Sequence, residues 1–70
     1  MTNVNLLKAA MAKVGDTNFV ADIARLLNVS RSTASTKLNG KAEFKQSEIA
    51  KIAKHYNLTA ENIKEIFVRE

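Results

Sequence analysis

The chain has 70 residues, 46% of them hydrophobic, no cysteine and a formal net charge of +4. A chain of that length makes one domain that buries about 60% of its unfolded surface, and without cysteine it has neither disulfides nor thiolate metal sites. No apolar run approaches the ~18 residues of a membrane span, and the start has no signal-peptide pattern, so we expect a cytoplasmic protein folded as a single domain over residues 1–70.

The first predicted element is a helix over residues 3–14, with the first three residues frayed. Its apolar residues recur at helical spacing and form an inner stripe made of Val4, Leu7, Ala10, Met11 and Val14. Gly15 predicts the end of this helix, because glycine readily takes the left-handed conformation after a last turn. The turn that follows contains Thr17 and Asn18, and either one is the expected N-cap of the next helix. The amides exposed at that helix start could bind a phosphate, although capping without any ligand explains the residues equally well.

The second predicted helix covers residues 19–27 and leads into a short turn. Its inner face is the stripe Val20, Ile23, Ala24 and Leu27. Asn28 then tolerates a left-handed backbone, and Ser30 is a good N-cap for the helix that follows. Two helices joined by about three residues are typical of a helix-turn-helix, which here spans about residues 18–39.

The third predicted helix, residues 31–38, has an unusual composition. Only Ala34 and Leu38 are apolar, and Asn39-Gly40 ends the helix. The hydroxyl side chains are Ser32, Thr33, Ser35 and Thr36. They are mediocre helix formers, but short polar side chains let a helix approach the floor of the DNA major groove. A solvated face would explain the hydroxyls alone, whereas the preceding helix, the turn and Gly40 favour a DNA-reading helix.

The positive charge is confined to one part of the chain. Residues 31–54 contain six Lys or Arg against two Glu, an excess of +4, whereas the rest of the chain has five charges of each sign. A DNA phosphate backbone favours such a basic stretch and releases counterions when it binds. The alternative is that lysines on exposed helix faces keep the protein soluble.

Two further helices complete the predicted fold. A connector over residues 41–44 is anchored by Phe44, and a helix over 45–56 follows, with an inner stripe of Ile49, Ile52, Ala53 and Tyr56. Thr59 is the expected N-cap of a last helix over 60–67, with Glu61 in its first turn, where a negative charge suits the helix dipole. This helix buries Ile63, Ile66 and Phe67. Because no segment alternates with strand periodicity, the predicted fold class is all-α, with five short helices.

The apolar end of the chain has two interpretations. It either closes the core against the first helix, or it forms a self-complementary patch for a twofold dimer. In the second case the interface consists of Tyr56, Leu58, Phe67 and Val68. A dimer would align two DNA-reading helices with successive major grooves, ~34 Å apart.

Other chemistry has little support in the sequence. His55 is the only imidazole, with no cysteine to accompany it, and we expect a surface or half-buried helix residue rather than a metal ligand. No phosphate-binding glycine loop or nucleophile–base pair is present. We therefore expect no enzyme activity, no cofactor, no metal and no small-molecule ligand.

The segment IARLLNVSRSTASTKLNGKAEF, followed by EIAKIAKHYNLTAENIKEIF, resembles the lambda-repressor-like helix-turn-helix family. Within that family the chain is most similar to the small Cro-type or repressor proteins of phages and prophages. The specific motif covers residues 19–41, and the five-helix outline covers nearly the whole chain. The resemblance implies a regulator that binds double-stranded DNA at a short inverted-repeat operator, as a homodimer at least on DNA.

The resemblance also implies roles for individual residues. Base edges would be read from the start of the third helix, by Arg31, Ser32, Ser35 and Thr36. The DNA backbone would be contacted by Thr17, Asn18, Thr33, Lys37, Asn39, Lys41 and Lys45. Arg31 is the strongest candidate, because a guanidinium can bind guanine O6 and N7 with two hydrogen bonds.

Two departures from the family pattern bear on these assignments. Val20 occupies a position where many members have a phosphate-binding Gln, and Asn28 occupies a turn position that is often Gly, which changes little. The third helix also lacks the Gln or Asn that commonly reads adenine. Specificity would then depend on Arg31, on thymine-methyl contacts from Thr36 and on DNA shape. The alternative function is a helical protein-interaction module, or an accessory factor such as an antitoxin or a recombination factor, that reuses the same fold.

Overall fold

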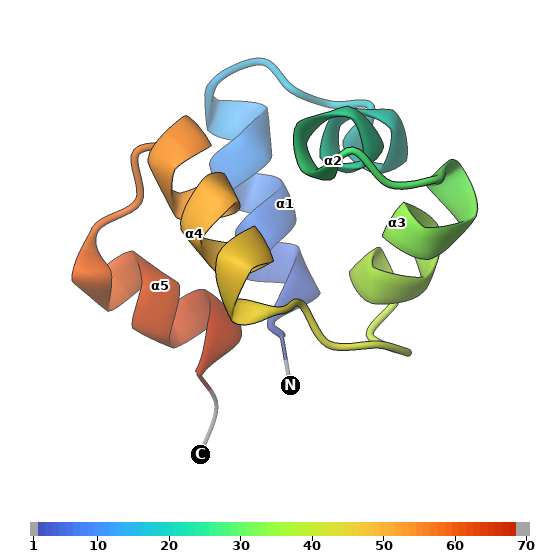
Figure 1. Ribbon diagram of the computed structural model, residues 1–70. Coiled ribbons are helices and arrows are strands. Elements are labelled where there is room, and N and C mark those ends of the chain that lie inside the picture. Colours follow the sequence, from blue (N-terminus) through green and yellow to red (C-terminus); the bar gives the residue numbers. More distant parts are fainter. Residues whose placement is uncertain (1, 69–70) are drawn as a thin grey trace.

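A computed structural model describes residues 2–68 and contains five helices over that range (Figure 1). They are α1 (Val4–Lys13), α2 (Phe19–Leu27), α3 (Arg31–Leu38), α4 (Gln46–His55) and α5 (Ala60–Phe67). The all-α fold class with five short helices is therefore confirmed. The predicted boundaries of the second, third and fifth helices agree with the structure, and the first and fourth helices are each one residue shorter at both ends.

The first four helices end in the same way, with one residue in the left-handed conformation. That residue is glycine at Gly15 and Gly40, with φ of 89° and 77°, and asparagine at Asn28 and Asn57, with φ of 56° and 53°. At each end the following amide donates to the carbonyl five residues back, as in Lys41 N to Thr36 O at 3.0 Å. This is the Schellman arrangement, which satisfies carbonyls that the helix leaves unpaired. The predicted stops at Gly15 and Gly40 and the left-handed Asn28 are confirmed.

The starts of α3 and α5 are capped by the hydroxyl side chains that the sequence predicts. The Ser30 Oγ accepts from Thr33 N at 3.1 Å, and the Thr59 Oγ1 accepts from Asn62 N, also at 3.1 Å. Asn18, rather than Thr17, is the N-cap of α2, and its side chain makes no capping bond to that helix. Asn3 caps α1, so the expectation of a frayed start is wrong for Thr2 and Asn3, while Met1 lies outside the described residues.

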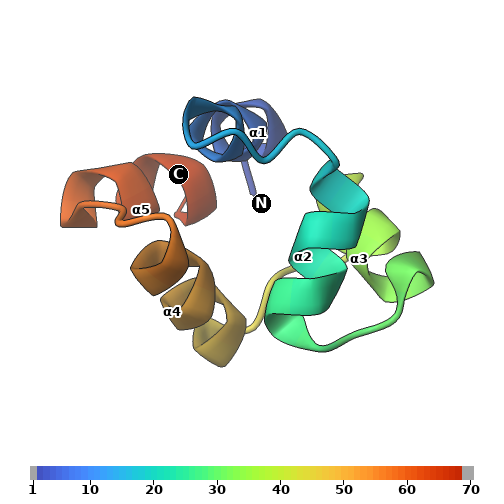
Figure 2. The same ribbon diagram turned by 90° about the horizontal axis from the view of Figure 1, so that it is seen from above.

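The helices α2 and α3 form a corner unit that α4 and α5 repeat. Each unit joins its two helices through a left-handed Asn, an apolar residue and a hydroxyl N-cap, as Asn28-Val29-Ser30 and as Asn57-Leu58-Thr59. The same amide bonds close both turns: Val29 N donates to Ala24 O at 3.0 Å, and Leu58 N donates to the matching Ala53 O at 2.9 Å. Figure 2 shows the two units side by side, with α1 lying across one end of both. The chain therefore contains the same inter-helix turn twice, although α2 and α3 pack on each other more closely than α4 and α5 do.

The core lies where α1 and the two units meet. Its largest fully buried side chains are Leu7, Met11, Ile23 and Ile52, each 0% exposed, which come from α1, α2 and α4. Phe44 packs edge-to-face on Phe67 with ring centroids 5.8 Å apart, which confirms that the connector is anchored in the core. Burying apolar side chains of this size provides most of the driving force for folding a chain without disulfides.

The chain end closes the core against α1. The Asn3 amide donates to the Ile66 carbonyl at 2.6 Å, and α1 packs on α5. Tyr56 and Phe67 are each only 7% exposed, so the prediction that they form a dimer surface is wrong. Leu58 is half-buried and Val68 is 57% exposed. Val14, predicted on the inner stripe, is instead 61% exposed, because the helix has already ended at Lys13.

In the part of the chain that the structure describes, none of the helices combines the length and the apolar character required to cross a bilayer.

Candidate nucleic-acid interface

One face of α3 packs on the core and the other is open to solvent. Ala34, Lys37 and Leu38 are buried, at 0%, 7% and 2% exposed. Four of the predicted DNA contacts lie on the open side, namely Arg31, Ser32, Thr33 and Thr36, and Ser35 is half-buried beside them. Because inward positions recur every three or four residues, the helix presents the remaining positions together on one surface. The side chains predicted to read bases therefore share a face.

Hydrogen bonds within and beside α3 already use some of the donors and acceptors of its hydroxyl groups. The Thr36 hydroxyl donates to the Ser32 carbonyl at 2.9 Å, and the Ser30 hydroxyl donates to Thr33 Oγ1 at 3.0 Å. The Asn39 amide donates to Ser35 Oγ at 3.3 Å. Since the Thr36 hydroxyl proton is used inside the helix, Thr36 offers an acceptor oxygen and a methyl group to a ligand. A methyl group suits contact with thymine.

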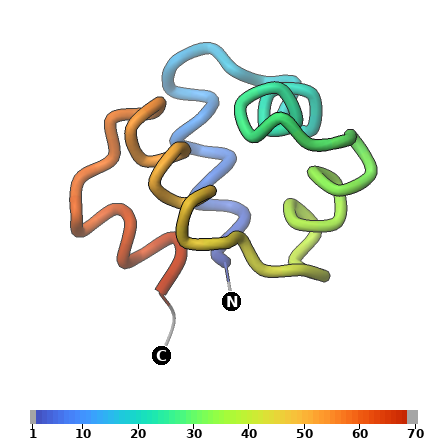
Figure 3. Tube along the Cα trace, in the orientation of Figure 1, coloured from blue at the N-terminus to red at the C-terminus, as the bar shows by residue number. Residues whose placement is uncertain are grey.

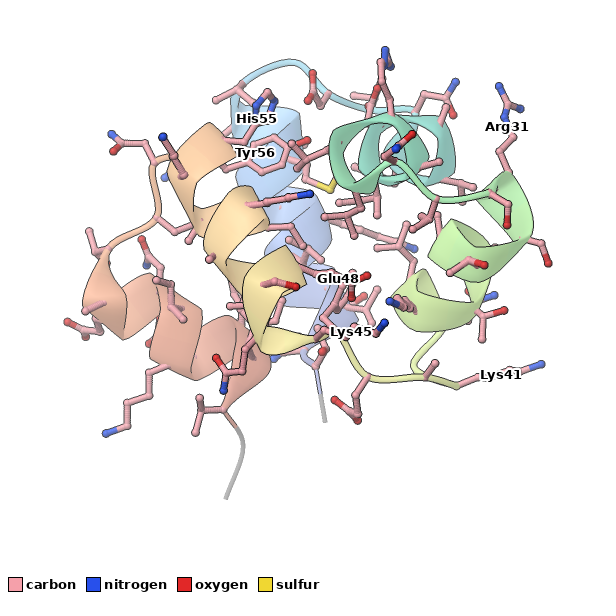
Figure 4. The ribbon with its side chains drawn as sticks, viewed as in Figure 1. Arg31, Lys41, Lys45, Glu48, His55 and Tyr56 are labelled. Carbon is pink, nitrogen blue, oxygen red and sulfur yellow. The ribbon has the colours of Figure 1, made fainter. Side chains whose placement is uncertain are left out.

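Three exposed cations lie at the ends of α3 and in the connector after it. Arg31 begins the helix, Lys41 follows its end, and Lys45 precedes α4. Figure 4 shows the Arg31 and Lys41 side chains projecting into solvent from opposite ends of α3. Among residues 2–68, Arg31 has no ion-pair partner. Figure 3 shows the connector running from the end of α3 to the start of α4, and Figure 4 shows Lys41 near its α3 end and Lys45 near its α4 end.

Lys37 faces inward, so the prediction that it contacts the DNA backbone is wrong. Its Nζ donates to both carboxylate oxygens of Glu48, at 2.5 and 2.6 Å, and the two side chains are only 9% and 11% exposed. The Nζ also lies 6.0 Å from the centre of the Phe44 ring. A charge so enclosed and neutralised is not offered to a phosphate. The pair instead connects α3 to the first turn of α4.

Glu48 also holds the connector. Its Oε1 accepts from the Lys45 amide at 2.8 Å, which caps the start of α4 (Figure 4). Burial alone would raise the pKa of Glu48, but the hydrogen bonds from Lys37 and Lys45 and the charges of those two residues lower the pKa below its usual value. The carboxylate therefore stays ionised near neutral pH and fixes α3, the connector and α4 relative to one another.

Sequence reasoning missed this pair because it assigned Lys37 to the DNA backbone and gave Glu48 no partner in the fold. Helical spacing carried a signal that could have found it: Lys37 comes three residues after the buried Ala34, and Glu48 comes four residues before the buried Ile52. A Lys and a Glu that both lie on inner stripes of neighbouring helices are expected to pair, since unpaired charges are rarely buried.

The other predicted backbone contacts are exposed. Thr17 and Asn18 precede α2, and Asn39 follows α3. Because the Asn18 side chain is not used for capping α2, its amide group remains available to a ligand. The structure therefore leaves every predicted DNA contact except Lys37 accessible, with Ser35 only partly so.

The rest of the surface has little reactive chemistry. His55 is exposed, and its ring meets Tyr56 edge-to-face at 4.7 Å. The Tyr56 hydroxyl donates to Asp16 Oδ2 at 2.8 Å, and burial together with that bond raises the pKa of Tyr56 above its usual value. Over residues 2–68 no group of His, Cys, Asp or Glu is arranged to hold a metal ion.

Comparison with known proteins gives one match. A family model described as the BetR domain matches residues 3–66, which is nearly the whole chain. No curated protein and no solved structure matches the chain.

Proposed function

Because the chain belongs to the BetR domain family of small helical domains of helix-turn-helix type, we propose that it is a sequence-specific, non-enzymatic DNA-binding regulator of transcription. In this proposal α3 enters the major groove of a short inverted-repeat operator, and the protein acts as a small Cro-type or repressor protein of phage or prophage origin does.

The observation that carries the proposal is the open face of α3. It combines an unpaired guanidinium with short hydroxyl side chains, and it has no large apolar residue that would prevent a close approach to base edges. The buried side of the same helix is fixed by Ala34, Leu38 and the Lys37–Glu48 pair. A helix held rigidly on one side and polar on the other is suited to reading a groove.

Residues take distinct roles in this proposal. Arg31 reads a base pair with its guanidinium, while Ser32, Ser35 and Thr36 contact neighbouring base edges. Phosphates are contacted from the flanks by Thr17, Asn18, Thr33, Asn39, Lys41 and Lys45. Backbone contacts set the register and base contacts set the sequence preference. The positive excess in residues 31–54 attracts DNA from a distance.

The experiment that tests this proposal is selection of binding sites from a randomised duplex pool at moderate salt. Enrichment of an inverted repeat is the expected result, with half-sites whose spacing places two copies of α3 in successive major grooves, ~34 Å apart. A variant with Arg31→Ala, Ser32→Ala and Thr36→Ala is the control, because all three side chains are exposed and the fold should survive their loss.

The outcomes separate the proposed function from its alternative. Enrichment by the wild-type chain and not by the triple variant supports DNA reading through α3. If no sequence is enriched, and the residual binding disappears as salt rises, the DNA-reading proposal is wrong. The chain would then be a helical protein-interaction module.

A further inference from the structure

An open groove of about 410 Å³ lies between α1 and the α4–α5 unit, away from the nucleic-acid interface. Its α1 side consists of Leu6, Ala9, Ala10, Lys13 and Val14, and its other wall includes Leu58, Glu65 and Ile66. Leu6 and Val14, at 42% and 61% exposed, are two of the three exposed large hydrophobic side chains in the described part of the chain. The groove combines these exposed apolar side chains with a polar rim that includes Lys13 and Glu65, a combination found at surfaces where proteins associate.

The α1 helix has one wide apolar stripe, and the core covers only part of it. Leu7 and Met11 are fully buried, whereas Leu6, Ala10 and Val14 lie beside them at spacings of four residues and line the groove. The other side of the helix is polar, with Asn5, Lys8 and Lys13. The apolar stripe of a surface helix normally packs against another surface, so the uncovered part of this stripe is available to a partner.

The stripe is self-complementary when two copies of α1 run antiparallel. Ala9 and Ala10 are small and lie at its middle, while the larger Leu6 and Val14 lie at its two ends, about 12 Å apart along the helix axis. A twofold axis near Ala10 places Leu6 of one copy against Val14 of the other. Small central residues let the two helices approach closely, and isologous contacts of this kind close a dimer.

The charged residues at the rim of the groove, Lys13 and Glu65, are consistent with the same twofold axis. Lys13 is the last residue of α1, and Glu65 lies beside Ile66, whose carbonyl accepts from Asn3 at the start of α1. The two charges therefore lie at opposite ends of the groove within one chain. The antiparallel pairing brings Lys13 of each copy to the Glu65 end of the other and creates two equivalent ion pairs.

We propose that this groove is the interface of a symmetric homodimer in which the α1 helices of two copies pack antiparallel. A typical stable interface takes ~800 Å² from each partner, about a sixth of the 4629 Å² accessible surface of this chain. Figures 1 and 2 place α3 at one end of the molecule and α5 at the other, so the pairing leaves both copies of α3 uncovered. The proposal extends the proposed function, because it supplies the twofold that an inverted repeat requires.

Sedimentation equilibrium over a range of protein concentrations, without DNA, tests the pairing by charge reversal. Lys13→Glu and Glu65→Lys each replace two ion pairs by like charges, and each should raise the dimer dissociation constant by about tenfold or more. The double variant restores both pairs and should return the constant to near its wild-type value. Lys64→Glu is the matched control, because Lys64 is exposed on α5 and does not line the groove.

A second variant, Leu6→Gln, tests the apolar contact and should also weaken the dimer by about tenfold. Circular dichroism on every variant separates loss of pairing from loss of fold. A wild-type chain that stays monomeric, or charge reversals that leave the constant unchanged, would overturn the pairing. In that case half-site binding by α3 would still stand, whereas a dimer that selects no DNA would contradict only the proposed function.

Discussion

Single residues decide where the helices of this protein end. Gly15, Asn28, Gly40 and Asn57 occupy left-handed positions, and Asn28 lies in the turn before α3 while Gly40 lies in the turn after it. Asparagine and glycine adopt this conformation at little cost, whereas other residues pay about 1–2 kcal/mol. The local chemistry of four residues therefore sets the boundaries of four helices.

The identity of residue 28 should affect stability in a predictable order. Asn28→Ala places a β-carbon without a compensating polar group at φ 56°, and we expect a loss of about 1 kcal/mol in the free energy of unfolding. Asn28→Gly removes the steric conflict and should be neutral or slightly stabilising. Urea unfolding of both variants measures the difference. Equal destabilisation by Ala and Gly would mean that the Asn side chain, rather than the backbone conformation, matters.

Arg31 should determine preference at one base pair. Its side chain is exposed at the first position of α3, and Arg31→Ala should reduce binding to the preferred site by about 1–3 kcal/mol while relaxing selectivity at a single position. Competition binding with single-base variants of the selected site measures this effect. Equal weakening on every sequence would instead identify Arg31 as a phosphate contact.

At the scale of helices, the Lys37–Glu48 pair determines how α3 sits on the molecule. Its two carboxylate contacts at 2.5 and 2.6 Å link α3 to α4, and the bond from Lys45 N adds the connector. Propensity and periodicity predict each helix from its own residues. Periodicity places Lys37 and Glu48 on inner stripes of their helices, but it does not show that these two stripes face each other, which is why the helices were predicted correctly and this link was not.

Breaking the pair from one side should destabilise the fold. Lys37→Met leaves an ionised Glu48 nearly buried, and we expect a loss of roughly 2–3 kcal/mol, less than the ~3–5 kcal/mol of a deep pair, because both side chains retain about a tenth of their surface. Replacing both residues, as Lys37→Met with Glu48→Leu, should recover most of that loss. Urea unfolding measures all three proteins, and additive losses in the double variant would contradict a coupled pair.

The same pair predicts a pH dependence of stability. Because the folded pKa of Glu48 lies below its usual value, its stabilisation is fully present above the unfolded pKa of ~4.3 and is lost as pH falls through the lowered folded pKa. Glu48→Gln should flatten this part of the stability curve between about pH 5 and pH 2. Unfolding midpoints measured across that range test it, with Glu61→Gln as a control on an exposed carboxylate.

At the scale of the whole molecule, the charge distribution differs from the count of charged residues. The sequence places an excess of +4 in residues 31–54, but one of those lysines, Lys37, faces Glu48 inside the protein. The cations that remain near α3 are Arg31, Lys41 and Lys45. The basic region was thus predictable from composition. Which of its cations are exposed depends on the packing of α3 on α4, which composition does not show.

The salt dependence of DNA binding should show which of these lysines contact DNA phosphates. Lys41→Gln is expected to weaken binding on every sequence and to reduce the slope of log affinity against log salt by about 1, since one phosphate contact is lost. Lys64→Gln, the same change on exposed α5, should leave the slope unchanged. Titrations at several salt concentrations measure both slopes. If the two variants have the same slope, DNA binding depends on the net charge of the chain and not on a phosphate contact at Lys41.

The proposed dimer surface was the least predictable feature at this scale. The apolar run at the chain end suggested a surface there, yet Phe67 fills the core and Tyr56, which follows α4, donates a hydrogen bond to Asp16. Exposed apolar surface gathers instead on α1, where Val14 extends past the last helical residue. Sequence periodicity assigned Val14 to the inner stripe, because it cannot tell that a helix stops one residue earlier.

The repetition of one inter-helix turn in α2–α3 and α4–α5 has a consequence for how quickly the chain can fold. Each turn is closed by hydrogen bonds between residues close in sequence, and α2–α3 and α4–α5 are both packed helix pairs. Domains dominated by such local contacts fold within about microseconds to milliseconds. The bond between Asn3 and Ile66 joins α1 to the end of α5, and that closure must overcome the largest loop entropy. We therefore expect two preformed corners that the docking of α1 joins in the last step.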